Sequence, residues 1–452
     1  MFAGAGDFLA PGGRLPWPGG PAWLRGVSDH TVSPFDPPPV RRREIFGWSC
    51  FDFANSAFTT IIITVVYAVY FTEVVARGEA QAAGWWGTVL GVSQISVLLA
   101  APLVGALADV TARKKDFLMV TAANCALATI GLYWAGPGDL WLALGLVLVA
   151  NIAFSLGENL CAAFLPEIST PATAGRISSY GWSFGYLGGL LSLVLALIII
   201  RSGEGRVPWT FVMTGVFFLS ASLPTWLLLR ERARPRSKPA GTGWLALGGG
   251  QLAQMMRELP KHRTLLIFFG AMTLFLAGLT AVVAFAAVYA TAVLGMMQGE
   301  IIGLFVVLQL AGVAGAYGFG VLQDRIGAKP ALVVSLVQWI VVCVWAAVCT
   351  TKTEFYIIGM IAGAAMGSLQ SSGRAVVSSL TPPGRGGEFF GYWGFFGKLA
   401  AVIGQPVFGW VAATAGFRSA ILVNAGFFLA GLLIVLGLSL KPGAADDRAN
   451  GP

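Results

Sequence analysis

Four ionisable residues stand out deep within the long apolar stretches of this sequence: Asp52, Glu158, Arg374 and Lys398. A charged side chain inside the hydrocarbon of a bilayer costs roughly 2.5–3.5 kcal/mol by insertion scales, so such residues are rare and are usually paired or functional. Two of the four are acids in the first half of the chain, and two are bases in the second half. The chemistry that they suggest is ion pairing between the halves, with proton exchange at the carboxyl groups.

The composition indicates that these charges belong to a membrane protein. Of the 452 residues, 56% are hydrophobic and 11% are charged, and the mean hydropathy is +0.75, whereas an average soluble domain carries about 25% charged residues. The net charge of +8 is typical of basic cytoplasmic loops, so no nucleic-acid partner is expected. The cysteines lie in apolar stretches without metal-ligand spacing, which predicts small buried residues and neither disulfides nor a metal site. They are Cys50, Cys125, Cys161, Cys343 and Cys349.

Twelve apolar stretches are long enough to cross a bilayer, which takes about 20 residues. The expected spans are 45–75, 86–108, 117–135, 140–164, 177–200, 209–229, 265–290, 301–322, 331–350, 355–380, 389–413 and 419–440. If both termini are cytoplasmic, 22 of the 29 Lys and Arg residues fall on the cytoplasmic face and five on the other. Because basic residues accumulate on cytoplasmic segments, we expect a multi-pass protein of the cell (inner) membrane with both termini inside.

The spans divide the chain into two halves between tails. Residues 1–43 are rich in Gly and Pro, and we expect a disordered cytoplasmic tail there. Residues 44–229 and 264–440 are the expected N-terminal and C-terminal six-helix bundles. Residues 230–263 form a cytoplasmic linker, whose second part has the apolar spacing of an amphipathic helix on the membrane surface. Residues 441–452 form a C-terminal tail.

A repeated segment relates the two halves. Glycine, followed four residues later by aspartate and then by basic residues, occurs at Gly105 and Asp109 and again at Gly320 and Asp324, 215 residues further on. Repeated six-helix halves are typical of secondary transporters, which bind the substrate near the bilayer midplane between the halves. The glycine permits close approach of helices, and the aspartate can bind the positive N-terminal end of a neighbouring helix.

The repeated segment resembles the G-x-x-x-D-x-x-x-R-K/R signature of the major facilitator superfamily. Residues 47–58, Gly-Trp-Ser-Cys-Phe-Asp-Phe-Ala-Asn-Ser-Ala-Phe, are similar to the opening helix of the vacuolar amino-acid effluxer family and its bacterial relatives of unknown function. Further similar segments lie at 164–168, 181–189 and 388–391, and the resemblance covers residues 43–440. This chain departs from the family at 277–279, Ala-Gly-Leu, where members often carry an Asp, and at Ala162, where they often carry an Asn.

The resemblance implies an all-α fold of twelve transmembrane helices in two pseudo-symmetric six-helix bundles, with the first, fourth, seventh and tenth helices around a central cavity. It also implies a secondary active transporter for a small organic solute, with export of neutral amino acids as the activity of the eukaryotic members. In that fold the repeated segments form a conformational latch on the cytoplasmic side. The expected latch residues are Gly105, Asp109, Arg113, Lys114, Gly320, Asp324 and Arg325.

The substrate or proton pathway is expected around the intramembrane charges. At 1.5 Å per residue, Asp52, Glu158 and Arg374 lie about 9–10 Å from the cytoplasmic ends of their spans, and Lys398 lies about 14 Å from its own. We therefore expect an inter-half gate, in which Asp52 can pair with Lys398; a fixed pair that only sets helix register is the alternative. Burial favours the protonated form of a carboxyl group, so proton coupling through Asp52 or Glu158 is a further hypothesis. Asn55, one turn from Asp52, is the expected substrate contact.

The sequence does not suggest an enzyme. Residues 181–185 match the hydrolase motif G-x-S-x-G, but that motif needs a preceding strand and a histidine partner, and the histidines are His30 in the tail and His262 in the linker. No phosphate-binding G-x-x-x-x-G-K-S/T segment occurs, and no cofactor is expected. The expected partners are a small-molecule solute and the lipid bilayer, and we expect a monomer. Two alternatives stay open: a lipid or drug exporter, which the apolar run 276–286 would suit, and a non-transporting scaffold or receptor.

Overall fold

The structure is a computed structural model that describes residues 40–77, 79, 82–170, 172–233, 250, 253, 257, 258, 260, 262–382 and 384–438. The expected N-terminal tail, apart from residues 40–43, and the whole expected C-terminal tail lie outside these described residues. So does most of the linker, including its expected amphipathic helix. All regular elements of the described part are helical.

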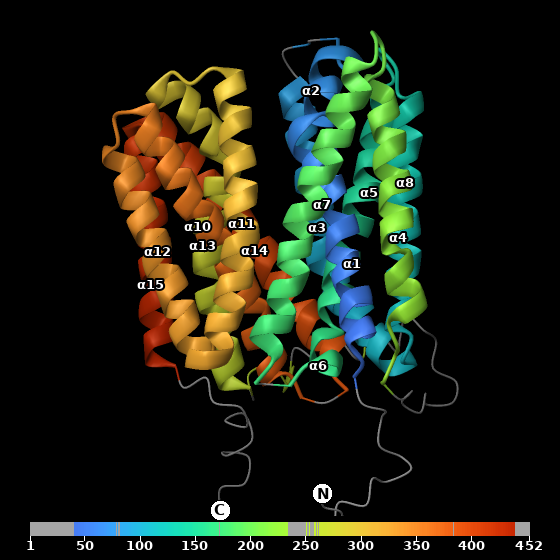
Figure 1. Cartoon of the computed structure of the whole chain (residues 1–452), viewed down its shortest axis with the longest axis vertical. Helices are drawn as coiled ribbons and strands as arrows, with labels where there is room; N and C mark the ends of the chain where they lie inside the picture. Colours follow the sequence, from blue (N-terminus) through green and yellow to red (C-terminus); the bar gives the residue numbers. More distant parts are fainter. Residues whose placement is uncertain are drawn as a thin grey trace, which may run out of the picture. The chain divides into compact units, whose positions relative to one another are not determined.

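Two groups of helices correspond to the two halves of the chain, coloured blue to green and yellow to red in Figure 1. The first half contains α1 (Arg42–Phe58), η2 (Thr59–Val65), α2 (Tyr67–Tyr70), η3 (Phe71–Val75), α3 (Ala82–Thr111), α4 (Lys114–Gly131), η4 (Leu132–Trp134), α5 (Leu140–Ala162), α6 (Leu165–Ile168), α7 (Ala174–Arg201) and α8 (Val207–Leu228). The second half contains α10 (Arg263–Leu294), α11 (Gln298–Ile326), α12 (Ala328–Val348), α13 (Lys352–Leu380), α14 (Gly386–Ala415) and α15 (Phe417–Gly437).

Eleven helical segments of the described residues are long and apolar enough to cross a membrane by length and composition. The remaining expected span corresponds to α13, which has 29 residues and a more polar sequence. Its polar side chains, including Ser368, Ser371, Ser372 and Arg374, are buried. Because they contact protein and not lipid, α13 can cross the bilayer without a continuous apolar sequence. The prediction of an all-α fold with twelve transmembrane helices is therefore confirmed.

Several helices extend beyond the expected spans at the end of the bundle that carries the α3–α4 and α11–α12 connections, which we name the basic end. Asp109 and Asp324 lie in the last turns of α3 and α11, whereas the expected spans end before them, at residues 108 and 322. These turns have low hydropathy because they contain aspartates. The aspartates remain within the helices because they bind groups of the other half. The first span also differs from a uniform α-helix, since η2 and η3 are π-helical. The π-helix is rare in proteins, and the examples that occur are often at functional sites.

The largest interfaces between the halves are α3 with α14 and α7 with α11, and α13 and α5 add contacts to α7 and α14. Along α7, close contacts with the other half run from Gly175 in the first turn to Gly189 just past the middle. On α14 they lie in the first third of the helix, at Gly387, Gly391 and Gly394. These contacts place the interface between the halves toward the basic end.

Candidate functional site

Asp52 of α1 and Arg374 of α13 form an ion pair across the two halves. Arg374 Nη1 lies 2.9 Å from Asp52 Oδ2. The same guanidinium donates from Nε to the Ser178 hydroxyl at 3.1 Å and from Nη2 to the Ser178 carbonyl at 2.9 Å. Arg374 is only 2% exposed, so its charge is held entirely by partners within the protein. The structure thus pairs Asp52 with Arg374, and not with Lys398.

Two tryptophans of the first half lie against the Arg374 guanidinium. Its Cζ is 4.7 Å from the ring centroid of Trp48 and 5.5 Å from that of Trp182. Such cation–π contacts contribute about 0.5–2 kcal/mol each, most when desolvated. The Trp48 ring is held in place because its indole N–H donates to the Cys161 carbonyl at 2.7 Å. Neither tryptophan is among the site residues predicted from the sequence, although both occur in segments that carry the family resemblance.

Gly181 of α7 leaves the space that the ion pair occupies. A Cβ atom at this position would overlap Asp52 Oδ2 and would lie 2.5 Å from Arg374 Nη2. Any side chain here would therefore displace the pair or push α7 away from α1. The G-x-S-x-G match thus falls on a helix, where its first glycine serves packing.

Glu158 of α5 and Lys398 of α14 are electrostatically coupled without a direct ion pair. The charge that acts most strongly on Glu158 is Lys398, ahead of Asp52 and Arg374, and Glu158 is the charge that acts on Lys398. In the described structure, neither residue has an ion-pair contact within 4.0 Å. Both side chains are partly exposed. The four expected charges thus form two pairs. We call Asp52 and Arg374, which are in contact, the closed pair, and Glu158 and Lys398, which are not in contact, the open pair.

Buried amide side chains lie near these pairs. Asn55 Oδ1 and Asn159 Nδ2 have no hydrogen-bond partner among the described residues, and each side chain is only 6% exposed. Asn151, in contrast, donates to the Ser93 hydroxyl at 2.5 Å and holds α5 to α3. Leaving a buried polar group unpaired costs about 1–3 kcal/mol. Asn55 and Asn159 therefore each carry an unpaired polar atom within this part of the structure.

Asp109 binds the N-terminus of a helix from the other half. Its Oδ1 accepts from the Gly387 N–H at 2.9 Å, and its Oδ2 accepts from the Glu388 N–H at 2.7 Å. These are among the first N–H groups of α14, which have no partner inside the helix and carry its positive partial charge. Lys114 Nζ lies 3.2 Å from Asp109 Oδ1 and also contacts Glu167. A Cβ atom at Gly105 would overlap the Gly387 carbonyl, so glycine is required at this crossing.

Asp324 makes the equivalent contact in the second repeat. Its Oδ1 accepts from the Arg176 N–H in the first turn of α7 at 3.1 Å, and its Oδ2 lies 3.5 Å from Arg176 Nε. A Cβ atom at Gly320 would overlap the Ser179 hydroxyl. Both repeats thus join an aspartate of one half to a helix N-terminus of the other. Their role as a latch stays a prediction.

Two of the expected latch residues make no such contact. Arg113 forms an exposed ion pair with its neighbour Asp116 at 3.5 Å. Arg325 is exposed and has no ion pair within the described part of the chain. Arg113 follows Asp109 by four residues and Arg325 follows Asp324 directly. Both lie where a helix ends, and both are exposed.

A charge cluster that the sequence analysis missed joins the start of the linker to this end of the first half. Arg232 Nη2 lies 2.7 Å from Glu44 Oε2, and the Arg232 N–H donates to Glu167 Oε2 at 3.0 Å. The Lys115 N–H donates to Glu231 Oε2 at 2.9 Å. Burial raises the pKa of the Glu231 carboxyl to about 7, although the Lys115 N–H opposes this shift. Glu231 and Arg232 lie in a run of alternating basic residues from 230 to 238 that resembles a solvated segment. Only their contacts distinguish them from the rest of that run.

Comparison with known proteins assigns the family. Residues 87–448 match the family model described as "Vacuole effluxer Atg22 like". The chain belongs to this Atg22-like family. The Atg22-like chain is 24% identical over 389 residues to the uncharacterized MFS-type transporter YxiO of Bacillus subtilis, an alignment that covers 82% of this chain and 89% of that protein. It is 22% identical over 301 residues to autophagy-related protein 22-1 of Penicillium rubens, covering 61% and 51% of the two proteins, so the alignment spans about half of the fungal protein.

The fold is that of the major facilitator superfamily. The structure of the human organic anion transporter MFSD10 superposes with a TM-score of 0.71 at 15% sequence identity, covering 88% of this chain and 100% of that one. Fold, family and relatives together make this Atg22-like chain a multi-pass membrane transporter of small-molecule solutes.

Proposed function

We propose that this chain exports a small zwitterionic solute, of the neutral amino-acid class, across the cell membrane by alternating access. The observation that carries the proposal is the open pair of Glu158 and Lys398, which are opposite charges on the two halves, coupled but not in contact, and each partly exposed. A zwitterion satisfies both, with its ammonium group near Glu158 and its carboxylate near Lys398. The unpaired amide atoms of Asn55 and Asn159 supply further polar contacts.

The closed pair of Asp52 and Arg374 supplies the gate in this proposal. Its contacts and those of the repeated aspartates Asp109 and Asp324 all join the halves toward the basic end. Basic residues concentrate at this end, so we assign it to the cytoplasm, together with both termini. The described conformation is then closed to the cytoplasm, and export requires these contacts to break and reform in each cycle.

Proton coupling through Asp52 or Glu158 is the second part of the proposal. Each carboxylate faces a base of the other half, so protonation would weaken the attraction that holds the halves together. Solute efflux from proteoliposomes should then follow an imposed pH gradient. Efflux that a proton uncoupler leaves unchanged would contradict this part and leave the substrate assignment standing.

The substrate class can be tested with matched solutes in proteoliposomes. Leucine, 4-methylpentanoate, which lacks the ammonium group, and 3-methylbutylamine, which lacks the carboxylate, have the same apolar skeleton. We expect saturable flux of leucine and only background flux of the other two. Lys398→Gln and Glu158→Gln should each abolish leucine flux, whereas Glu204→Gln, an exposed acid remote from the site, should retain it. Equal transport of the three solutes would refute the zwitterion assignment.

A drug or lipid exporter is the second candidate. The observation that favours it is the aromatic packing between α10 and α14. The ring centroids of Phe269 and Phe396 are 5.0 Å apart, and those of Phe285 and Phe408 are 4.7 Å apart. Flux of a hydrophobic dye that persists in Lys398→Gln would support this reading. Absence of flux for the amino acid, the dye and a lipid would instead indicate a scaffold or receptor.

A further inference from the structure

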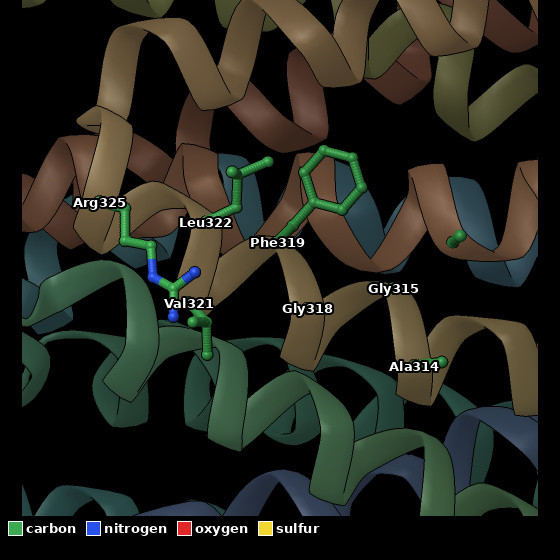
Figure 2. Close-up of a pocket in the computed structure, with 8 residues that line it drawn as sticks. Ala314, Gly315, Gly318, Phe319, Val321, Leu322 and Arg325 are labelled. Carbon is green, nitrogen blue, oxygen red and sulfur yellow. The ribbon is translucent and has the colours of Figure 1, made fainter.

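A groove runs along the outer surface of α11 toward the basic end, with a volume of about 520 Å³. Figure 2 shows its labelled residues following one another along one helix, with Arg325 at one end and Ala314 and Gly315 at the other. The wall is otherwise apolar: Ala314, Gly315, Gly318, Phe319, Val321 and Leu322 of α11, with Ala364 of α13. Ala314, Gly318 and Arg325 are exposed, so the groove opens on the surface of the bundle.

The length of the groove matches one leaflet of a bilayer. Ala314 and Arg325 are separated by 11 positions on one helix, which is about 16 Å at 1.5 Å per residue. Half of a 30 Å hydrocarbon core is about 15 Å. Arg325 lies at the penultimate position of α11, where the helix leaves the apolar layer. An acyl chain along the groove would therefore bring its headgroup to this guanidinium.

The charge at this end of the groove favours a negative headgroup. Arg325 is exposed and has no ion pair in the described structure, and its neighbour Asp324 is already engaged by Arg176. A basic side chain near the membrane surface strengthens binding of anionic lipid by about fivefold. A planar guanidinium can also bind a phosphate through two parallel hydrogen bonds.

We propose that this groove binds one anionic phospholipid, with an acyl chain against Gly318 and the phosphate on Arg325. The missing side chain at Gly318 provides the depth of the groove, since a Cβ atom there would meet nothing within 4 Å. This space also makes the position suitable for a test, because a larger residue can fill the groove without contacting another helix. The assignment is independent of which solute the protein transports.

Native mass spectrometry of the full-length purified protein provides the test, with phosphatidylglycerol and phosphatidylcholine of identical acyl chains as probes. We expect the wild-type chain to bind phosphatidylglycerol about fivefold more tightly than phosphatidylcholine. Arg325→Gln should remove this preference, and Gly318→Leu should reduce binding of both lipids. Matched controls are Arg113→Gln, which removes an exposed base outside the groove, and Gly426→Leu, which adds the same side chain on α15, where a Cβ atom also meets nothing within 4 Å.

The outcomes separate a built site from general lipid adhesion. Equal affinity of the wild-type chain for the two lipids would overturn the proposal, as would unchanged binding in Gly318→Leu. Loss of the preference in Arg113→Gln to the same extent as in Arg325→Gln would show that only the overall charge of the basic end matters. If Gly318→Leu does not fold, Ala314→Leu provides a second way to fill the exposed groove.

Discussion

Replacing Asp52 by asparagine removes the charge that faces Arg374 while leaving the shape of the side chain almost unchanged. Arg374 would then remain buried, with the Ser178 hydroxyl and carbonyl as its polar partners and with the rings of Trp48 and Trp182 against its guanidinium. Because the pair joins the two halves, the change should weaken the conformation that is closed at the basic end. A conformation in which the halves are separated at the basic end does not contain this ion pair, so the substitution should not destabilise it.

The magnitude follows from the burial of Arg374, which is 2% exposed. Removing one partner of a buried ion pair destabilises the paired state by about 3–5 kcal/mol. Since Ser178 and the tryptophans still hold the guanidinium, we expect the lower value, about 3 kcal/mol. That free energy corresponds to an increase of about 150-fold in the ratio of the open to the closed conformation.

Double electron–electron resonance can measure this ratio. Spin labels at Asp116 and Ile326 report the separation of the halves at the basic end, since both positions are exposed and lie on different halves. The five native cysteines are buried, so introduced surface cysteines can be labelled selectively. In Asp52→Asn we expect a second, longer distance to gain population. Glu204→Gln, an exposed acid at the opposite end, should keep the wild-type distribution.

The double variant decides whether the two charges act as a pair. If Asp52 and Arg374 stabilise the closed state through each other, Asp52→Asn with Arg374→Gln should shift the distances no further than the stronger single variant. Additive shifts would refute the gate and favour two independent contributions. Unchanged distances in every variant would show that the pair only sets helix register.

Three further predictions concern Gly181, Asp109 and Glu231. Gly181→Ala should lower the thermal unfolding midpoint by several degrees, because overpacking at Asp52 costs about 1–3 kcal/mol. Gly373→Ala, where a Cβ atom meets nothing within 4 Å, should leave the midpoint unchanged. Equal effects of the two substitutions would contradict this packing argument. Asp109→Asn should accelerate hydrogen exchange at the first amides of α14, because a charged acceptor of two N–H groups is lost at a cost of about 1.5–3 kcal/mol; unchanged protection would show that the helix end does not depend on the carboxylate. Burial raises the Glu231 pKa from its ordinary value near 4.5 to about 7. Its protonated form therefore stabilises the docked linker fully below about pH 4.5, and this stabilisation is lost as the pH rises through about 7. Protection of the Lys115 amide from exchange, corrected for intrinsic rates, should fall over that range and should lose this pH dependence in Glu231→Gln; the same profile in both proteins would rule out the carboxyl as its origin.

The sequence was sufficient to predict the number of spans, because hydropathy is a local property and each helix contributes its own signal. It was least accurate at helix ends. Asp109 and Asp324 interrupt the apolar pattern, so the expected spans end before them, yet both lie in helical turns that contact the other half. In the same way α13, which carries Arg374, has the weakest apolar signal of the second half because its polar side chains face protein.

The repeated glycine and aspartate, the two halves and the presence of two acids and two bases within the membrane could all be determined from residue types and spacing alone. Only the tertiary structure decided which acid meets which base. Asp52 and Arg374 are 322 positions apart, and their contact depends on the absence of a side chain at Gly181 and on the two tryptophan rings against the guanidinium. Such pairing is determined by the distance between the helices and by the rotation of each helix about its axis. Neither quantity can be read from the residue pattern along one helix. The open pair of Glu158 and Lys398 has the same origin, since the distance between two charges on different halves exists only once the halves have packed.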